Sequence, residues 1–174
     1  CIRDRANMSR FMDYVNARFG LKLQTYHELH QWSIENIPDF WATVWDFVGI
    51  KSSEPYTQVV DDLTRFPGAR WFPGARLNFA ENLLRYRDNH TAFIFRDERG
   101  RRITLTYAEL YDRVARLAKS LRAIGISPGD RVVAYMPNLI ETAIAMLAAT
   151  SLGAVWASCA TDVGAPAALS LIHI

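Results

Sequence analysis

The sequence predicts an α/β fold in which an N-terminal helical layer and a β-hairpin lead into a three-layer, parallel-sheet βαβαβ unit. Two observations in the stretch from Ile103 to Cys159 predict it. The spacing of apolar residues changes between strand and helix periods at each join, which is typical of strands connected by crossover helices. In addition, residues 132–135 form a continuous apolar run, as in a strand that is covered on both faces.

The first crossover helix is predicted over residues 107–124. Its apolar residues recur on one side, at Leu110, Val114, Leu117, Ala118, Leu121 and Ile124. Thr106 and Glu109 have the spacing of a capping box, and Gly125 is a typical helix end. We therefore expect one face of this helix in the core and the other in solvent.

The second crossover helix is predicted over residues 140–151, with Asn138 as its N-cap. It is apolar nearly all round, so it should be buried. The next strand is predicted over residues 154–158. In open parallel sheets, ligands bind beyond the carboxyl ends of the strands, so the loops after Tyr135 and Ser158 are the first places to look for a site.

Ahead of this unit, the sequence predicts short helices, a linker and a hairpin. Helical spacing with caps or stops predicts amphipathic helices over residues 9–19, 25–36 and 39–48. Residues 52–70 have the composition of an irregular linker, and Asn78 can cap a short helix. The hairpin strands are predicted over residues 91–96 and 102–106. The aromatic residues of the third helix favour a packing surface over a ligand-binding box.

Composition limits the class of protein. Half of the 174 residues are hydrophobic, which suffices for one domain with a core, alone or with an N-terminal extension. A net charge of +2 gives no reason to expect a nucleic-acid or membrane-surface partner. With only Cys1 and Cys159 and a polar N-terminus, neither a disulfide framework nor a signal peptide is indicated, and we expect a cytoplasmic protein.

Two local patterns have alternative interpretations. The stretch from Thr142 to Thr161 has no charged residue and is long enough to cross a bilayer, but its Ala, Ser, Thr and Gly content favours a buried helix followed by a buried strand. His27 and His30 could share a helix face as metal ligands, with Glu28 nearby. No further ligand follows at a suitable spacing, so surface histidines are the favoured interpretation.

Several segments carry a family resemblance. The chain resembles the N-terminal part of the acyl-adenylate-forming acyl-CoA synthetases in the segments WFPGARLNFAENLL, LTYAEL, GISPGDRVVAYMPN and ATSLGAVWASC. Within that family, the acetoacetate-activating members are favoured over the acetyl and propionyl members by SRFMDYVNARFG, HQWSIENIPDFWATVWDFVGI and AVWASC. The resemblance runs from about Met8 to Asp162, in order and at matching spacing.

The resemblance implies an AMP-forming acid–thiol ligase. Such an enzyme joins a carboxylate to ATP, releases pyrophosphate and passes the acyl group to coenzyme A. The implied ligands of the full-length enzyme are ATP, Mg²⁺, coenzyme A, and acetoacetate or another short carboxylate. This sequence has no Gly/Ser/Thr-rich loop ending in Pro-Lys, the element that holds the triphosphate in the family. We therefore expect an N-terminal fragment that is inactive alone, with the ATP and Mg²⁺ sites outside it.

The resemblance also implies a division of the chain. Residues 1–90 correspond to the N-terminal helical extension of the family, and residues 91–164 to the truncated start of the AMP-binding domain. Residues 165–174 depart from the family pattern, and we expect them to be a non-native or misread tail. The alternatives are a fragment of an acetyl- or propionyl-CoA synthetase, and a stand-alone α/β module that binds a partner through the aromatic residues between Trp32 and Phe47.

The candidate site is the loop after Cys159. In acetyl-type relatives the equivalent loop lies against the nucleotide of coenzyme A, which makes Ala160, Thr161 and Asp162 candidate coenzyme-binding residues. Acetoacetate-activating members usually have Ser-Pro-Asp-Phe-Gly here, whereas this chain has Ala-Thr-Asp-Val-Gly, so only the Asp and the Gly match. A plain strand-to-helix connection is the alternative interpretation. No catalytic residue and no metal ligand is assigned in this chain.

Overall fold

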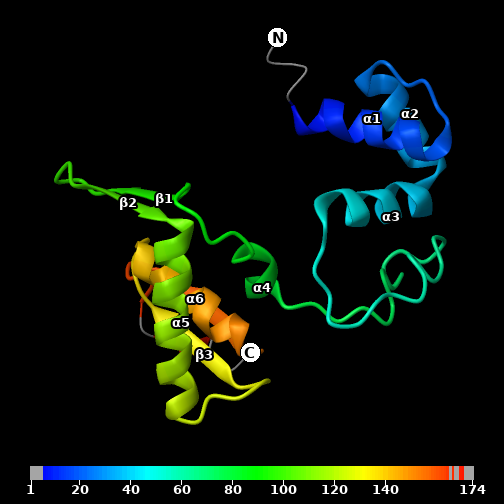
Figure 1. Cartoon of the computed structure of the whole chain (residues 1–174). Helices are drawn as coiled ribbons and strands as arrows, with labels where there is room; N and C mark the ends of the chain where they lie inside the picture. Colours follow the sequence, from blue (N-terminus) through cyan, green and yellow to red (C-terminus); the bar gives the residue numbers. More distant parts are fainter. Residues whose placement is uncertain (1–5, 165, 167–168, 171–174) are drawn as a thin grey trace. The chain divides into compact units, whose positions relative to one another are not determined.

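The chain forms two compact units, residues 1–77 and 78–174 (Figure 1). The computed structural model describes residues 6–164, 166 and 169–170. Cys1 and most of the segment 165–174 therefore lie outside the described residues. The predicted division at residue 90 and the predicted non-native tail after residue 164 stay predictions.

The first unit begins with the three helices expected from the sequence, α1 (Asn7–Phe19), α2 (Tyr26–Glu35) and α3 (Ile37–Val48). Gly20 and Gly49 end α1 and α3 with a left-handed φ of 66°, a conformation that glycine adopts without steric cost. At the start of α2, the Thr25 hydroxyl accepts a hydrogen bond from the N–H of Glu28 at 3.2 Å. The Glu28 carboxylate accepts from the N–H of Thr25 at 2.9 Å, which completes a capping box.

Aromatic side chains form much of the core of the first unit. Phe11, Val15 and Leu29 are buried between the helices. The Phe11 ring meets the rings of Phe40 and Phe47 edge-on, with centroids 5.8 and 5.2 Å apart. Phe40 and Phe47 of α3 therefore pack against this core, as the packing interpretation expects, whereas Trp41 is 41% exposed.

The segment that follows α3 is irregular, as predicted for a linker, but it folds back on itself. Glu54 pairs with Arg76, and Val60 pairs with Trp71, in isolated antiparallel bridges. The two segments that these bridges join therefore run in opposite directions. The Val60–Trp71 bridge closes residues 61–70 into a loop.

Between residues 78 and 164, the second unit forms one short helix, two longer helices and four strands. They are α4 (Phe79–Leu83), β1 (Thr91–Arg96), β2 (Arg102–Thr106), α5 (Tyr107–Ala123), β3 (Arg131–Tyr135), α6 (Ile140–Ser151) and β4 (Val155–Cys159). The Asn78 side chain caps α4 by accepting from the N–H of Glu81 at 3.0 Å. Thr106 and Glu109 form the predicted capping box of α5.

In the part of the chain that the structure describes, the strands form two separate two-stranded sheets. β1 and β2 are antiparallel, whereas β3 and β4 are parallel, with Tyr135 opposite Cys159. The α/β class and the β3–α6–β4 crossover are confirmed, but the prediction that β2 belongs to the same parallel sheet is wrong. The spacing of apolar residues indicates strands joined by a helix, but it does not show which strands pair with each other. Here the tight turn after Arg96 pairs β2 locally with β1.

An aliphatic core lies between α5, α6 and the hairpin. Its buried residues include Leu105, Leu110, Val114, Leu147 and Leu152. The β3–β4 sheet, in contrast, has one exposed face, on which Val133 is 40% and Val155 is 56% exposed. The prediction that these strands are covered on both faces is therefore wrong for the described residues, because the helices cover only one of them. Ile124, predicted in the buried stripe, follows the last helical residue and is exposed.

The uncharged stretch from Thr142 to Thr161 folds as the end of α6 followed by β4, as predicted. The N-cap of α6 is Leu139 and not the predicted Asn138. A leucine side chain accepts no hydrogen bond, so α6 begins without a side-chain cap. In its first turn the Thr142 hydroxyl donates to the Pro137 carbonyl at 2.8 Å. No helix in the described part of the chain is both long enough and apolar enough to cross a membrane.

Candidate functional site

The candidate site lies at the carboxyl ends of β3 and β4. The two strands end in register at Tyr135 and Cys159, and the N–H of Met136 donates to the Cys159 carbonyl at 3.2 Å. The loops that follow the two strands therefore start side by side. This is the edge at which open parallel sheets bind their ligands.

The predicted site residues form a turn directly after β4. Ala160, Thr161 and Asp162 are all exposed, and the N–H of Val163 donates to the Ala160 carbonyl at 3.2 Å. Among the described residues, the Thr161 hydroxyl and the Asp162 carboxylate have no hydrogen-bond or ion-pair partner. Both groups are therefore available to a ligand.

Tyr135 ties this turn to β3. Its hydroxyl oxygen lies 2.7 Å from the Thr161 carbonyl oxygen and 2.9 Å from the Val163 carbonyl oxygen. Carbonyl oxygens only accept and the phenol has a single O–H proton, so the hydroxyl donates one hydrogen bond, which the two carbonyl oxygens share. In the sequence, Tyr135 is recognisable only as the last residue of a predicted strand. The signal that could have found it is a hydrogen-bonding side chain at the point where a strand ends beside a candidate loop.

The free groups of the turn suit the nucleoside part of a nucleotide. A threonine hydroxyl donates and accepts hydrogen bonds, so Thr161 fits a ribose hydroxyl or a phosphate oxygen. The Asp162 carboxylate only accepts and repels phosphate, so it fits an adenine amino group or a ribose hydroxyl. The turn itself contains no basic residue. The residues present are thus compatible with the adenosine of coenzyme A, while its phosphates need partners elsewhere.

Both histidines of α2 lie beside the ring of Tyr26. The His30 ring stacks on Tyr26 with centroids 6.1 Å apart. The Glu28 carboxylate is occupied by the N–H groups of Gln24 and Thr25, and these bonds, that of Gln24 most, lower the pKa of Glu28. Within the described residues, no three His, Cys, Asp or Glu side chains are grouped so that they could hold a metal ion.

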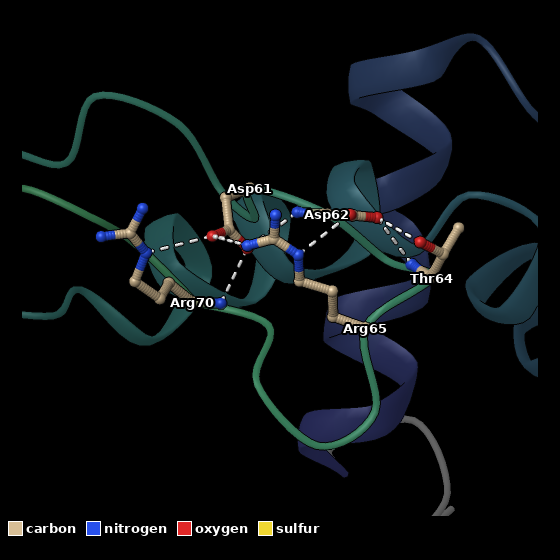
Figure 2. Close-up of polar contacts among 5 residues, drawn as sticks. All are labelled: Asp61, Asp62, Thr64, Arg65 and Arg70. Atoms are coloured by element: carbon tan, nitrogen blue, oxygen red, sulfur yellow. Dashed lines mark hydrogen bonds and ion pairs between the residues drawn. The ribbon is translucent and has the colours of Figure 1, made fainter.

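Figure 2 shows a cluster of charged residues in the linker. The Asp61 carboxylate accepts from the backbone N–H of Arg70 at 2.8 Å and from its guanidinium at 3.1 Å. Asp62 accepts from the Thr64 hydroxyl at 2.6 Å and pairs with Arg65 at 3.2 Å. The pKa of Asp61 is lowered chiefly by the Arg70 backbone N–H, and that of Asp62 chiefly by the Thr64 hydroxyl. The acids and bases of this cluster therefore pair with one another and close the loop.

An apolar hollow of about 410 Å³ opens between the helices of the first unit. Phe11, Leu29, Phe40 and Val44 contribute to its wall. Ligand sites generally combine apolar walls with a few convergent polar groups that orient the ligand. Polar residues, among them Asn7, His30 and Ser33, also line this hollow. It does not lie at the strand edge where open parallel sheets bind their ligands, so the turn after β4 remains the better candidate.

Comparison with known proteins gives two family matches. Residues 79–172 match the family described as AMP-binding enzyme, and residues 26–83 match the acetyl-coenzyme A synthetase N-terminus. The two matches meet close to residue 78, where the second compact unit begins.

Individual relatives carry the similarity across nearly the whole chain. Acetoacetyl-CoA synthetase of Xenopus tropicalis is 44% identical over 160 residues, which are 90% of this chain and 24% of that protein. Malonamoyl-CoA synthetase of Penicillium aethiopicum is 43% identical over 164 residues, which are 90% of this chain and 23% of that protein. The solved structure of acetoacetyl-CoA synthetase from Streptomyces lividans matches with a TM-score of 0.89 at 39% identity, covering 98% of this chain and 27% of that one.

These similarities confirm the resemblance found in the sequence. The chain spans about a quarter of the length of the curated relatives it matches. The structural match extends over both compact units, so each has a counterpart in an acyl-CoA synthetase. Because the AMP-binding match alone covers more than half of the residues, the chain belongs to the AMP-binding enzyme family.

Proposed function

We propose that this chain is the N-terminal part of an AMP-forming acetoacetate–CoA ligase. In the proposed reaction, the acetoacetate carboxylate attacks the α-phosphorus of ATP and pyrophosphate leaves. The thiol of coenzyme A then attacks the acyl carbon of the adenylate, and AMP leaves. The observation that carries the proposal is the similarity to the S. lividans acetoacetyl-CoA synthetase, which holds at 39% identity across 98% of the chain.

The choice of acid has a second candidate. The malonamoyl-CoA synthetase is about as similar to this chain as the acetoacetyl-CoA synthetases are, at 43% identity. Acetoacetate and malonamate share one skeleton, a carboxylate with a carbonyl on its β carbon, and differ only in a terminal methyl or amino group. We therefore propose a short β-oxo or β-amido acid as the substrate class, with acetoacetate as the first choice.

In this proposal the chain supplies scaffold and one edge of the coenzyme site. Thr161 and Asp162 contact the adenosine of coenzyme A through their free side-chain groups, and Ala160 lies beside them in the same turn. ATP and Mg²⁺ bind to residues beyond this sequence, which has no Gly/Ser/Thr-rich loop ending in Pro-Lys.

The test is acid-dependent ATP–pyrophosphate exchange by the full-length protein that carries this chain. Acetoacetate should support the fastest exchange. Butyrate lacks the β-carbonyl, so it should be at least about a hundredfold poorer in kcat/KM, because a site built to hydrogen-bond that group would be left unpaired. Malonamate serves as the matched competitor. Equal or faster exchange with acetate or propionate would contradict the proposal and favour an acetyl- or propionyl-CoA synthetase.

The isolated 174-residue chain is the companion sample. It should show no acetoacetate-dependent exchange, because the proposed triphosphate-binding loop is absent from its sequence. Acid-dependent turnover by this chain alone would show that its own residues bind ATP. The proposal that ATP binds to residues beyond this sequence would then be wrong.

A further inference from the structure

The turn after β4 has few contacts that hold its shape. Within it, the Val163 N–H donates to the Ala160 carbonyl at 3.2 Å. Among the contacts of the described residues, the other hydrogen-bonding group that reaches the turn is the Tyr135 hydroxyl, which lies within 2.9 Å of the carbonyl oxygens of Thr161 and Val163. A turn with exposed side chains and few hydrogen bonds opens readily unless it is tied to a rigid element.

The strand that carries Tyr135 is such a rigid element. β3 is paired with β4 over its whole length, from Arg131 opposite Val155 to Tyr135 opposite Cys159. The backbone of Tyr135 is therefore held in the sheet, and its phenol reaches the turn from there. Its two acceptors flank Asp162 in the chain, so the hydroxyl fixes the backbone on both sides of the one acidic side chain of the turn.

We propose that Tyr135 is a positioning residue that holds the 160–163 turn in the shape that presents the Thr161 hydroxyl and the Asp162 carboxylate to coenzyme A. This inference rests on the proposed function and goes beyond it, because it assigns a role to a residue that does not touch the coenzyme itself. Tyr135 acts through the backbone of the turn, so its hydroxyl matters for coenzyme binding and not for activation of the acid.

This role predicts a split between the two half-reactions. Adenylate formation proceeds without coenzyme A, so it should not depend on the turn. Thioester formation requires the coenzyme, so its KM for coenzyme A should rise when the turn loses its tie. A general loss of fold would lower both half-reactions together.

The test uses Tyr135→Phe in the full-length protein, which removes the hydroxyl and keeps the ring. Hydrogen–deuterium exchange without any ligand should be about fivefold faster in peptides that cover residues 159–164, the size of change expected when one neutral hydrogen bond is lost. The KM for coenzyme A, and its Kd by calorimetry, should rise about fivefold. ATP–pyrophosphate exchange should stay within about twofold of the parent protein. Tyr86→Phe is the matched control, because the Tyr86 ring contacts Tyr107 and its hydroxyl has no hydrogen bond among the described residues.

Each outcome is decisive. Unchanged hydrogen exchange in Tyr135→Phe would show that the Tyr135 hydroxyl does not hold the turn. Faster exchange with an unchanged affinity for coenzyme A overturns the positioning role and leaves the proposed ligase function standing. If the parent protein makes a thioester with a different acid, the function proposal fails in its substrate, while the coenzyme measurements are made with that acid and still test Tyr135. If the parent protein binds no coenzyme A at all, both proposals fail.

Discussion

The cores of the two compact units are built from different kinds of side chain. The first unit packs short helices through aromatic rings, with Phe11 between Phe40 and Phe47, and it leaves an apolar hollow of about 410 Å³ between them. The second unit packs two longer helices against a hairpin through aliphatic side chains such as Leu105 and Leu147, which are almost fully buried. The two cores therefore differ in the side chains that fill them, edge-on rings in one and aliphatic chains in the other.

The difference has a consequence for the candidate site. The turn after β4 starts from a paired strand of the well-packed second unit, so its position is determined to within the freedom of a few residues. The linker of the first unit is irregular, and a polar cluster around Asp61 closes it (Figure 2). We expect core substitutions to be most damaging in the second unit and polar substitutions to matter locally in the first.

The largest expected effect is that of Leu147→Ala in α6. Leu147 is 3% exposed, and removing a buried isobutyl group leaves a cavity, so the free energy of unfolding of the second unit should fall by about 3 kcal/mol. Urea unfolding followed by hydrogen exchange of separate peptides measures this unit by itself. Ile124→Ala, at a residue that is 76% exposed, is the control and should cost less than about 0.5 kcal/mol. A similar loss from both variants would contradict the described core.

A smaller effect is expected for Phe11→Leu in the first unit. Leucine keeps the residue apolar but removes two edge-on ring contacts, so the unfolding free energy of this unit should fall by about 1–2 kcal/mol. The same peptide-resolved exchange is the measurement, with Ile34→Ala at a half-exposed position as the control. A loss as large as that of Leu147→Ala would show that the two cores are packed equally well.

The capping boxes allow a direct comparison of the units at one kind of site. Thr25→Ala and Thr106→Ala should each cost about 1 kcal/mol, because each leaves a helix N–H without its acceptor. Thermal unfolding of the two variants measures the loss. If the two variants lose clearly different amounts of unfolding free energy, the difference shows how strongly each helix depends on its N-terminal cap.

The same caps predict a dependence on pH. The pKa of Glu109 lies below its ordinary value of 4.5, chiefly because its carboxylate accepts from the Thr106 N–H. A carboxyl with a lowered pKa in the folded state stabilises it above the ordinary value, and this contribution is lost as the pH falls through the lowered pKa. Between pH 6 and pH 3, Glu109→Gln should therefore lose less stability than the parent protein, because glutamine can fill the same position without titrating. Parallel pH curves for the two proteins would contradict this cause.

The smallest expected effect is that of Asp61→Asn, which keeps the shape of the side chain and removes its charge. The ion pairs of Asp61 with Arg65 and Arg70 would be lost, so the loop over residues 61–70 should be cleaved roughly two- to fivefold faster in limited proteolysis at pH 7. Asp13→Asn, on the exposed side of α1, is the matched control. Cleavage at an unchanged rate would show that the loop is held by its backbone bridges alone.

Local signals in the sequence were sufficient for much of this picture. The helices, the hairpin, the capping boxes at Thr25 and Thr106, and the parallel crossover of β3 and β4 all follow from residues within a few positions of each other. The position of the candidate turn follows as well, because a site at the end of a parallel strand needs only the strand to be recognised.

Contacts between distant residues could not be obtained in this way. The pairing of β2 with β1 alone, the exposed face around Val133 and the reach of the Tyr135 hydroxyl to a carbonyl 26 residues away depend on how whole elements pack. Periodicity and capping act through the backbone over one or two helical turns, so the chain itself encodes them locally. Strand pairing and contacts between distant side chains depend on how all the elements pack together. No short stretch of residues carries that information.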